Sequence, residues 1–230
     1  MPAENGLGTV LVTGGSSGLG AAVAAAIRDE GGTPVVLDVK EPPDGFAFEP
    51  VDLAQPREAE AAVERIAERD GLDAVVTAAG IDACGDLGDV DAEAWERVIA
   101  VNLVGTVAVV RAALPHLERA QGRVVTVAST LGVRALPAAT AYCASKFGIV
   151  GFTRALAAET GGRVGVTLLI PGGMQTPFFD DRPEEFKPAP DQHLNRPEDV
   201  ARTVVFALRQ PAGCEVRELL VAPATEPSWP

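Results

Sequence analysis

Two kinds of segment alternate along nearly the whole chain, and this alternation constrains the fold more than any other feature. Short runs rich in β-branched residues predict strands at residues 9–13, 35–38, 46–51, 74–77, 124–128, 164–170 and 219–221. Alanine-rich runs between them predict helices at residues 19–30, 57–69, 92–117, 141–159 and 198–209. Strands that alternate with helices form a parallel sheet with helices on both faces. We therefore predict a doubly wound α/β fold with about seven strands.

Length and composition limit the class of protein. A chain of 230 residues suits one domain that spans residues 1–230. The net charge of −13 opposes contact with phosphate backbones and anionic lipids, so we expect neither a nucleic acid nor a membrane as partner. Three cysteines without a close pair and two histidines argue against a disulfide framework and against a metal site. The N-terminus shows no basic leader and no long apolar run, so the cytoplasm is the expected location.

A glycine-rich segment follows the first predicted strand and leads directly into a helix. Residues 13–20 read Thr-Gly-Gly-Ser-Ser-Gly-Leu-Gly. Glycines let the chain turn tightly and approach a ligand closely, and the helix N-terminus offers free N–H groups to a pyrophosphate. A turn that only connects strand and helix is the alternative. The position between a strand and a helix favours a dinucleotide site.

Asp38 indicates which dinucleotide would bind. It ends the second predicted strand, eighteen positions after Gly20, close to the spacing expected of an acid that binds the adenosine ribose. A carboxylate there accepts hydrogen bonds from the 2′- and 3′-hydroxyls of NAD and repels the 2′-phosphate of NADP. Lys40 is the one nearby cation and could weaken this preference. We therefore expect NAD as the cofactor.

Tyr142 and Lys146 form a pair suited to proton transfer. Positions i and i+4 share one face of a helix, so the ammonium lies near the phenol. A nearby positive charge favours the phenolate and should lower the pKa of Tyr142, the only tyrosine in the chain. Such a tyrosine can act as a general acid or base on an alcohol oxygen. A simple pair on the helix surface is the alternative.

Taken together, the motifs resemble those of the short-chain dehydrogenase/reductase family, whose fold is a single-domain Rossmann-type sheet. The resemblance extends from about residue 9 to about residue 209. It rests on T-G-x-x-x-G-x-G at 13–20, Asn102, Ser129 thirteen positions before Tyr142, Y-x-x-x-K at 142–146, and P-G-x-x-x-T at 171–176.

The resemblance implies a hydride transfer between NAD(H) and a secondary alcohol or ketone. Tyr142 would exchange the proton, Lys146 would lower its pKa and bind the nicotinamide ribose, and Ser129 would stabilise the substrate oxygen. Asn102 would hold a water of a proton relay, and Thr176 with the backbone near Met174 would anchor the carboxamide. The expected catalytic residues are Asn102, Ser129, Tyr142 and Lys146.

The resemblance also assigns residues to the cofactor and the substrate. The expected cofactor contacts are Gly14, Ser16, Ser17, Gly18, Leu19, Gly20, Asp38, Asp52, Leu53, Ala79, Gly80, Tyr142, Lys146, Pro171, Gly172, Met174 and Thr176. The expected substrate contacts, for a partly apolar alcohol or carbonyl compound, are Ser129, Leu131, Tyr142, Phe178 and Phe179. Family members usually pair through the helices that hold Asn102 and Tyr142, so a homodimer or homotetramer is expected.

Two departures from the family pattern stand out. Residues 77–80 read Thr-Ala-Ala-Gly where the family usually has Asn-Asn-Ala-Gly, so side-chain hydrogen bonds that brace this region are expected to be lost. The family's usual glycine-rich C-terminal ending is also missing, which places the usual tetramer contacts in question. Instead the chain closes with an irregular tail at residues 222–230, in which Trp229 could pack on another subunit.

Residues 176–196 are rich in proline, charge and phenylalanine, and they break the alternation of strands and helices. Long irregular segments in compact domains are usually functional or mobile, so we expect a substrate lid, with a plain surface loop as the alternative.

A different class of function also fits this fold: a non-catalytic protein that senses NAD or regulates a partner. Such a protein has no need of all four catalytic positions, and the chain carries all four. An epimerase or dehydratase of an extended related family is disfavoured, because little chain follows the sixth strand to build a large substrate domain.

Overall fold

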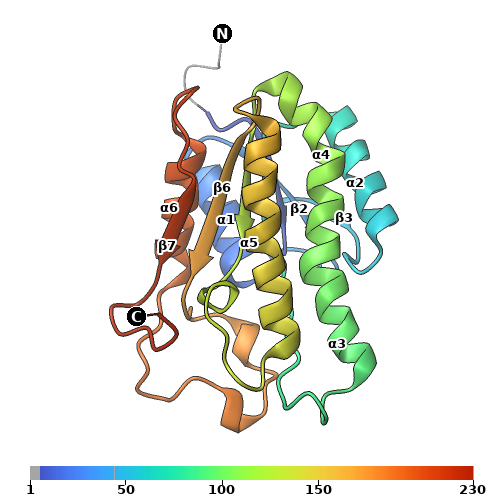
Figure 1. Cartoon of the computed structure of the whole chain (residues 1–230). Helices are drawn as coiled ribbons and strands as arrows, with labels where there is room; N and C mark the ends of the chain where they lie inside the picture. Colours follow the sequence, from blue (N-terminus) through green and yellow to red (C-terminus); the bar gives the residue numbers. More distant parts are fainter. Residues whose placement is uncertain (1–5, 44, 230) are drawn as a thin grey trace.

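Seven parallel strands form a single sheet in the order β3-β2-β1-β4-β5-β6-β7 (Figure 1). This arrangement comes from a computed structural model that describes residues 6–43 and 45–229. The strand order reverses between β1 and β4, as in a doubly wound fold, and the predicted fold class is confirmed. The strands are β1 (Thr9–Thr13), β2 (Thr33–Asp38), β3 (Ala47–Pro50), β4 (Ala74–Thr77), β5 (Arg123–Val127), β6 (Gly165–Pro171) and β7 (Glu218–Val221).

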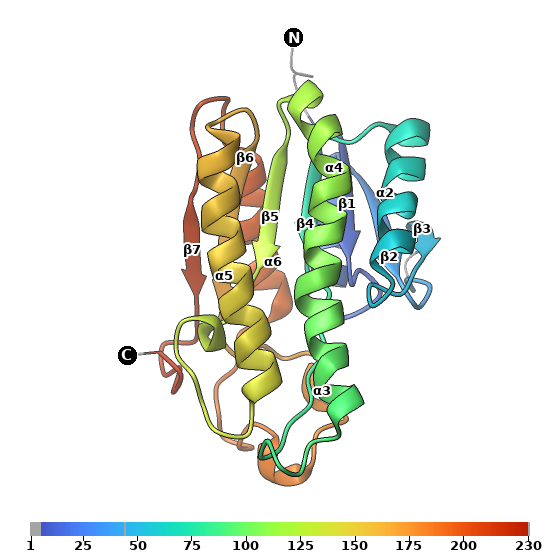
Figure 2. The ribbon, with the colours of Figure 1, turned by 45° about the vertical axis from the view of Figure 1, so that its right-hand side comes forward.

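Helices cover both faces of the sheet because alternate residues of each strand point to opposite sides. Val10 and Val12 of β1 pack on α1 (Gly18–Asp29) and α6 (Pro197–Leu208). Leu11 of the same strand faces the other side, which is covered by α2 (Pro56–Asp70), α4 (Thr106–Ala120) and α5 (Thr140–Thr160) (Figure 2). Both cores consist mainly of valine, leucine, isoleucine and alanine, as the sequence predicts.

The helix predicted at residues 92–117 is interrupted by an unusual turn. It consists of α3 (Ala92–Ile99), a π-helical turn at Ala100–Gly105, and α4. π-helical turns are rare and often lie at functional sites, and this one contains Asn102. The whole run, Ala92–Ala120, is long and apolar enough to cross a membrane by composition alone, but 56% of its apolar window is buried inside the protein. It serves as a core helix beside α2 and α5.

The carboxyl ends of the strands lie at one end of the molecule, where several irregular segments gather. The segment after β6 crosses this end with two short 3-10 turns, Pro177–Phe179 and Glu184–Phe186 (Figure 1). The chain after β7 folds back toward the same end. Ligands of doubly wound sheets bind at this end, near the reversal of strand order.

Candidate active site

A cavity of about 660 Å³ opens at the carboxyl end of the sheet, and loops that follow β1 to β6 line it. All predicted catalytic, cofactor and substrate residues line this cavity except Ser16 and Asn102. Ser16 supports the wall, since its backbone N–H donates a hydrogen bond to Asp38 Oδ2 at 3.1 Å. Among the described residues, no cluster of histidine, cysteine and acidic side chains could hold a metal ion.

The glycine-rich turn brings the backbone of β1 against the loop after β4. Gly14 has a φ of 71°, in the left-handed region that favours glycine, and an added Cβ would lie 2.6 Å from Ala79 Cα. Helix α1 starts at Gly18, so its free N–H groups point into the cavity mouth. The turn and helix end fit the pyrophosphate of a dinucleotide.

Two carboxylates line the cavity at the ends of β2 and β3, and each is held by hydrogen bonds within the protein. Asp38 Oδ2 accepts from Ser16, and its Oδ1 accepts from the Lys40 N–H at 3.2 Å, so the carboxylate is fixed at the cavity wall. Asp52 pairs with Arg97 at 2.9 Å. Burial would raise the pKa of Asp52, but hydrogen bonds from the Ala54 N–H and Arg97 outweigh it and lower the pKa.

Tyr142 lies in the first turn of α5, with its ring 5.5 Å from the ring of Phe178. Burial is the main influence on its hydroxyl and raises the pKa well above the usual value, and the charge of Asp82 raises it further. Ser129 and Arg182 act in the opposite direction. The predicted lowering of this pKa by Lys146 is wrong for this structure, because desolvation dominates.

Lys146 is 4% exposed, and its Nζ donates to the carbonyl of Val127 at 2.8 Å. Nζ lies 5.5 Å from the centroid of the Tyr142 ring, so the two side chains share one face of α5 as predicted. Burial lowers the pKa of Lys146 to about 8, since a desolvated ammonium is costly.

Ser129 lies at the end of β5 and caps the 3-10 turn Thr130–Gly132. Its Oγ accepts a hydrogen bond from the Leu131 N–H at 3.1 Å, which leaves the hydroxyl proton available to a ligand. The turn packs tightly on α5, because a Cβ at Gly132 would lie 2.8 Å from the Lys146 carbonyl oxygen. This packing brings Ser129 to the same part of the cavity as Tyr142.

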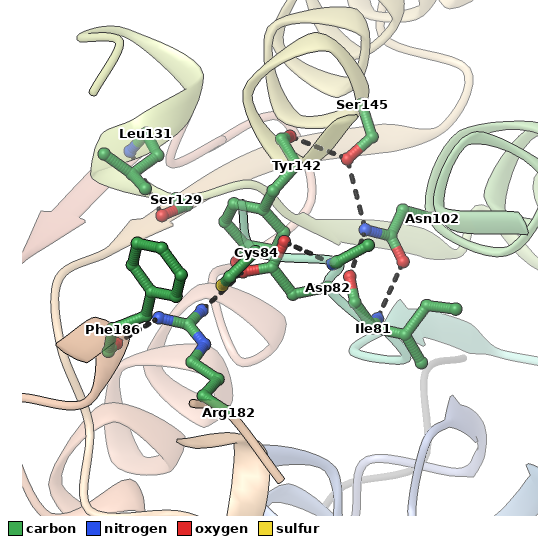
Figure 3. Close-up of polar contacts among 11 residues, drawn as sticks. Ile81, Asp82, Cys84, Asn102, Ser129, Leu131, Tyr142, Ser145, Arg182 and Phe186 are labelled. Carbon is green, nitrogen blue, oxygen red and sulfur yellow. Dashed lines mark hydrogen bonds and ion pairs between the residues drawn. The ribbon is translucent and has the colours of Figure 1, made fainter. Parts of the chain in front are cut away.

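Asn102 is 1% exposed and braces the loop after β4 (Figure 3). Its Oδ1 accepts from the Ile81 N–H at 2.8 Å, and its Nδ2 donates to the Ile81 carbonyl at 2.9 Å and to Ser145 Oγ at 3.1 Å. The loop that lacks the usual asparagines is therefore held from the neighbouring helix. The side chain of Asn102 positions other groups of the site and does not reach the cavity.

The structure adds residues that the sequence analysis missed. Arg182 lines the cavity and pairs with Asp82 at 2.6 Å. The C-terminal tail supplies Glu226, whose Oε2 accepts from the Gly173 N–H at 2.8 Å, and Ser228, whose hydroxyl lies 2.6 Å from Thr130 Oγ1. Arg182 belongs to the lid expected at residues 176–196, but no sequence signal marks these three residues individually, because their partners are distant in the chain.

The comparisons with known proteins agree on one family. The family model described as short chain dehydrogenase matches residues 8–186. A 2-(S)-hydroxypropyl-CoM dehydrogenase from Xanthobacter autotrophicus is 33% identical, over 88% of this chain and 90% of that protein. A D-beta-hydroxybutyrate dehydrogenase from Cupriavidus necator is 32% identical, over 89% of this chain and 84% of that protein.

The solved structures agree with the sequence comparisons. The aldohexose dehydrogenase of Thermoplasma acidophilum superposes with a TM-score of 0.83 at 25% identity, covering 93% of this chain and 92% of that one. The fold, the cavity at the carboxyl ends of the strands and the matched motifs thus agree, and the chain belongs to the short-chain dehydrogenase/reductase family of oxidoreductases.

Proposed function

We propose that the protein is an NAD-dependent dehydrogenase or reductase that interconverts a secondary alcohol and a ketone. The convergence of Ser129, Tyr142 and Lys146 on one wall of the cavity carries this proposal. Relatives with substantial identity support it, since their names describe dehydrogenases of hydroxylated compounds, among them a mouse L-fucose dehydrogenase at 30% identity.

A bound nicotinamide supplies or accepts the hydride, and the protein supplies orientation and charge. Tyr142 gives its proton to the carbonyl oxygen during reduction and takes it back during oxidation. Ser129 donates a hydrogen bond to the same oxygen and stabilises the charge that develops there. A tyrosine keeps its proton at neutral pH, which is the form that reduction requires, and burial raises the pKa of Tyr142 further.

Lys146 holds a positive charge under the reacting groups, and Asn102 keeps the wall of the site in place. A Cβ at Gly80 would lie 3.7 Å from Lys146 Nζ and 3.6 Å from Asn102 Oδ1, so both atoms flank this glycine. We propose that Lys146 binds the nicotinamide ribose through the space that Gly80 leaves open. We also propose that Asn102 belongs to a proton relay that reaches Lys146.

The preference for NAD over NADP rests on the fixed carboxylate of Asp38. We expect Asp38→Ser to reduce the ratio of kcat/KM for NAD over NADP by about ten- to a hundredfold, because the variant no longer repels a 2′-phosphate or accepts from the ribose hydroxyls. Initial rates with each cofactor measure this ratio. Glu41→Gln removes an exposed charge outside the cavity and serves as the control. An unchanged ratio in Asp38→Ser would argue against this role for Asp38.

A panel of secondary alcohols and ketones tests the proposed reaction. We expect the absorbance of the reduced nicotinamide to rise when the protein oxidises an alcohol with NAD, and to fall when it reduces a ketone with NADH. Tight binding of NAD without turnover across a broad panel would favour the non-catalytic sensor instead. The presence of all four proposed catalytic residues supports the enzyme, with Ser129, Tyr142 and Lys146 in the cavity lining and Asn102 bonded to Ser145 behind it.

Three further features extend this proposal. Residues 176–196 act as a lid, because Phe178 and Phe179 line the cavity. The chains pair through the helices around Asn102 and Tyr142, where Val104 and Phe147 are more than 40% exposed. The protein works in the cytoplasm, in keeping with three unpaired cysteines among the described residues.

A further inference from the structure

An ion pair lies beside Tyr142 and joins the segment after β6 to the loop after β4. Arg182 Nη2 lies 2.6 Å from Asp82 Oδ2, and the side chains are only 16% and 6% exposed (Figure 3). The two residues are a hundred positions apart in the chain. Buried pairs are costly to assemble from water, so this pair calls for a functional explanation.

The carboxylate of this pair is fully engaged by the protein. Asp82 Oδ1 accepts from the Ala83 N–H at 2.7 Å, and Oδ2 accepts from Cys84 Sγ at 3.2 Å as well as from Arg182. Asp82 does not line the cavity, whereas Arg182 does. The pair therefore presents hydrogen-bond donors to a ligand and no acceptor.

The guanidinium of Arg182 is held in place but incompletely bonded. It stacks over the rings of Phe178 and Phe179, 4.9 Å and 4.6 Å from their centroids. Beyond the bond to Asp82 it makes one long bond, 3.4 Å, to the Phe186 carbonyl. Its Nε has no hydrogen-bond partner among the described residues although it is buried. Because Nε is buried, a ligand in the cavity would meet the terminal nitrogens. Nη1 and Nη2 each keep one N–H group that these bonds do not use, and a ligand that supplies acceptors for them is favoured.

The position of this donor relative to the reacting group indicates the geometry of the ligand. Phe178 joins the two, since its ring contacts both the guanidinium of Arg182 and the ring of Tyr142. A substrate whose carbinol carbon lies at the Tyr142 hydroxyl would place beside Arg182 a group that is a few bonds from that carbon. A second cation, Lys187, also lines the cavity and pairs with Glu184 at 3.2 Å. Two acidic residues line it as well: Asp181 is exposed to solvent, and Glu226 is bonded to the Gly173 N–H.

We propose that Arg182 receives a carboxylate of the substrate, so that the substrate is a short hydroxy acid or oxo acid. This inference rests on the proposed dehydrogenase function and refines it. An alcohol or sugar hydroxyl would donate a hydrogen bond as well as accept one. Asp82 cannot accept that bond, because its oxygens are engaged by the protein and it does not line the cavity. A carboxylate accepts the free N–H groups, and charge assistance strengthens these bonds in a site screened by phenyl rings.

Reduction of acetoacetate and of its neutral amide, acetoacetamide, tests the proposal. The two compounds have the same size and differ in charge. With NADH, we expect the protein to favour acetoacetate by about a hundredfold or more in kcat/KM, because only the carboxylate gives charge-assisted hydrogen bonds to the N–H groups that Asp82 leaves free. Arg182→Gln should lower kcat/KM for acetoacetate by a similar factor. It should leave kcat/KM for acetoacetamide within about threefold of the wild-type value.

Three further variants keep the test independent of folding. Arg182→Lys retains the charge and should recover part of the preference. The double variant Asp82→Asn with Arg182→Gln avoids a buried unpaired carboxylate and should behave as Arg182→Gln does. Arg196→Gln removes an arginine of the same segment that pairs with Glu198 on the surface, and it should change neither rate.

Calorimetry of malonate binding to the protein saturated with NADH separates this inference from the proposed reaction. Malonate binding that is lost in Arg182→Gln would support the anion site, even if the protein turned over none of the compounds. Absence of turnover would count against the proposed reaction alone. Turnover of neutral ketones with no binding of malonate, or with equal binding in Arg182→Gln, would overturn the anion site and leave the dehydrogenase intact. Equal kcat/KM for acetoacetate and acetoacetamide would overturn it as well.

Discussion

Tyr142→Phe is expected to lower kcat by about a thousandfold, because the substrate oxygen loses its proton donor and no other phenol is present in the chain. The ring itself remains, so its contact with Phe178 at 5.5 Å and the shape of the cavity are kept. The dissociation constant for NADH should therefore stay within about twofold. Turnover on the best substrate of the panel and fluorescence titration with NADH measure the two effects.

Cys143→Ala provides a matched control for Tyr142→Phe. Cys143 is the next residue on α5 and is buried, but it does not line the cavity. We expect turnover of this variant to stay within about threefold of the wild type. If Tyr142→Phe kept near-normal turnover, Tyr142 would not be the general acid or base, and the mechanism proposed above would have to be abandoned.

Most of the fold could be predicted from sequence because its strands are buried on both faces. All five residues of β1 and all four of β4 are buried, so both strands appear as uninterrupted apolar or β-branched runs and were predicted with their observed limits. The edge strand β3 is only half-buried and shorter than predicted. The π-helical turn at Ala100–Gly105 escaped prediction because it leaves the helical hydrophobic pattern almost unchanged.

The candidate site also contains residues that could be predicted from the sequence and residues that could not. Ser129, Tyr142 and Lys146 follow from local motifs, since helix spacing and strand ends fix their neighbours. The pair Asp82–Arg182 depends on two irregular segments that meet only in the folded chain, and in sequence nothing distinguishes Arg182 from the other charged residues of 176–196. The direction of the Tyr142 pKa was likewise out of reach, because it depends on the depth of burial.

Lys146 illustrates why a group needed for chemistry can oppose stability. Burial lowers its pKa from 10.5 to about 8, so between these pH values the folded protein binds fewer protons than the unfolded chain. The free energy of unfolding contributed by this group therefore rises with pH through that interval. Below about pH 8 both states are protonated and the penalty is complete. The difference between the two pKa values corresponds to about 3 kcal/mol.

Lys146→Met should therefore raise the free energy of unfolding at pH 7 by about 1–3 kcal/mol, after allowance for the lost hydrogen bond to the Val127 carbonyl. The gain should shrink from pH 8 upward and vanish above about pH 10.5, where the wild-type lysine becomes neutral in both states. Urea unfolding at several pH values measures it. Turnover should fall by about a hundredfold or more, since the charge beneath Tyr142 is lost.

Lys40→Met separates the effect of burial from the loss of a charge. Lys40 is exposed, so its replacement should leave the free energy of unfolding within about 0.5 kcal/mol at every pH tested. A Lys146→Met variant that is less stable than the wild type at pH 7 would show that the bond to Val127 outweighs the desolvation of the ammonium. The pKa of Lys146 would then lie near its ordinary value, and the buried charge would contribute to the fold as well as to the reaction.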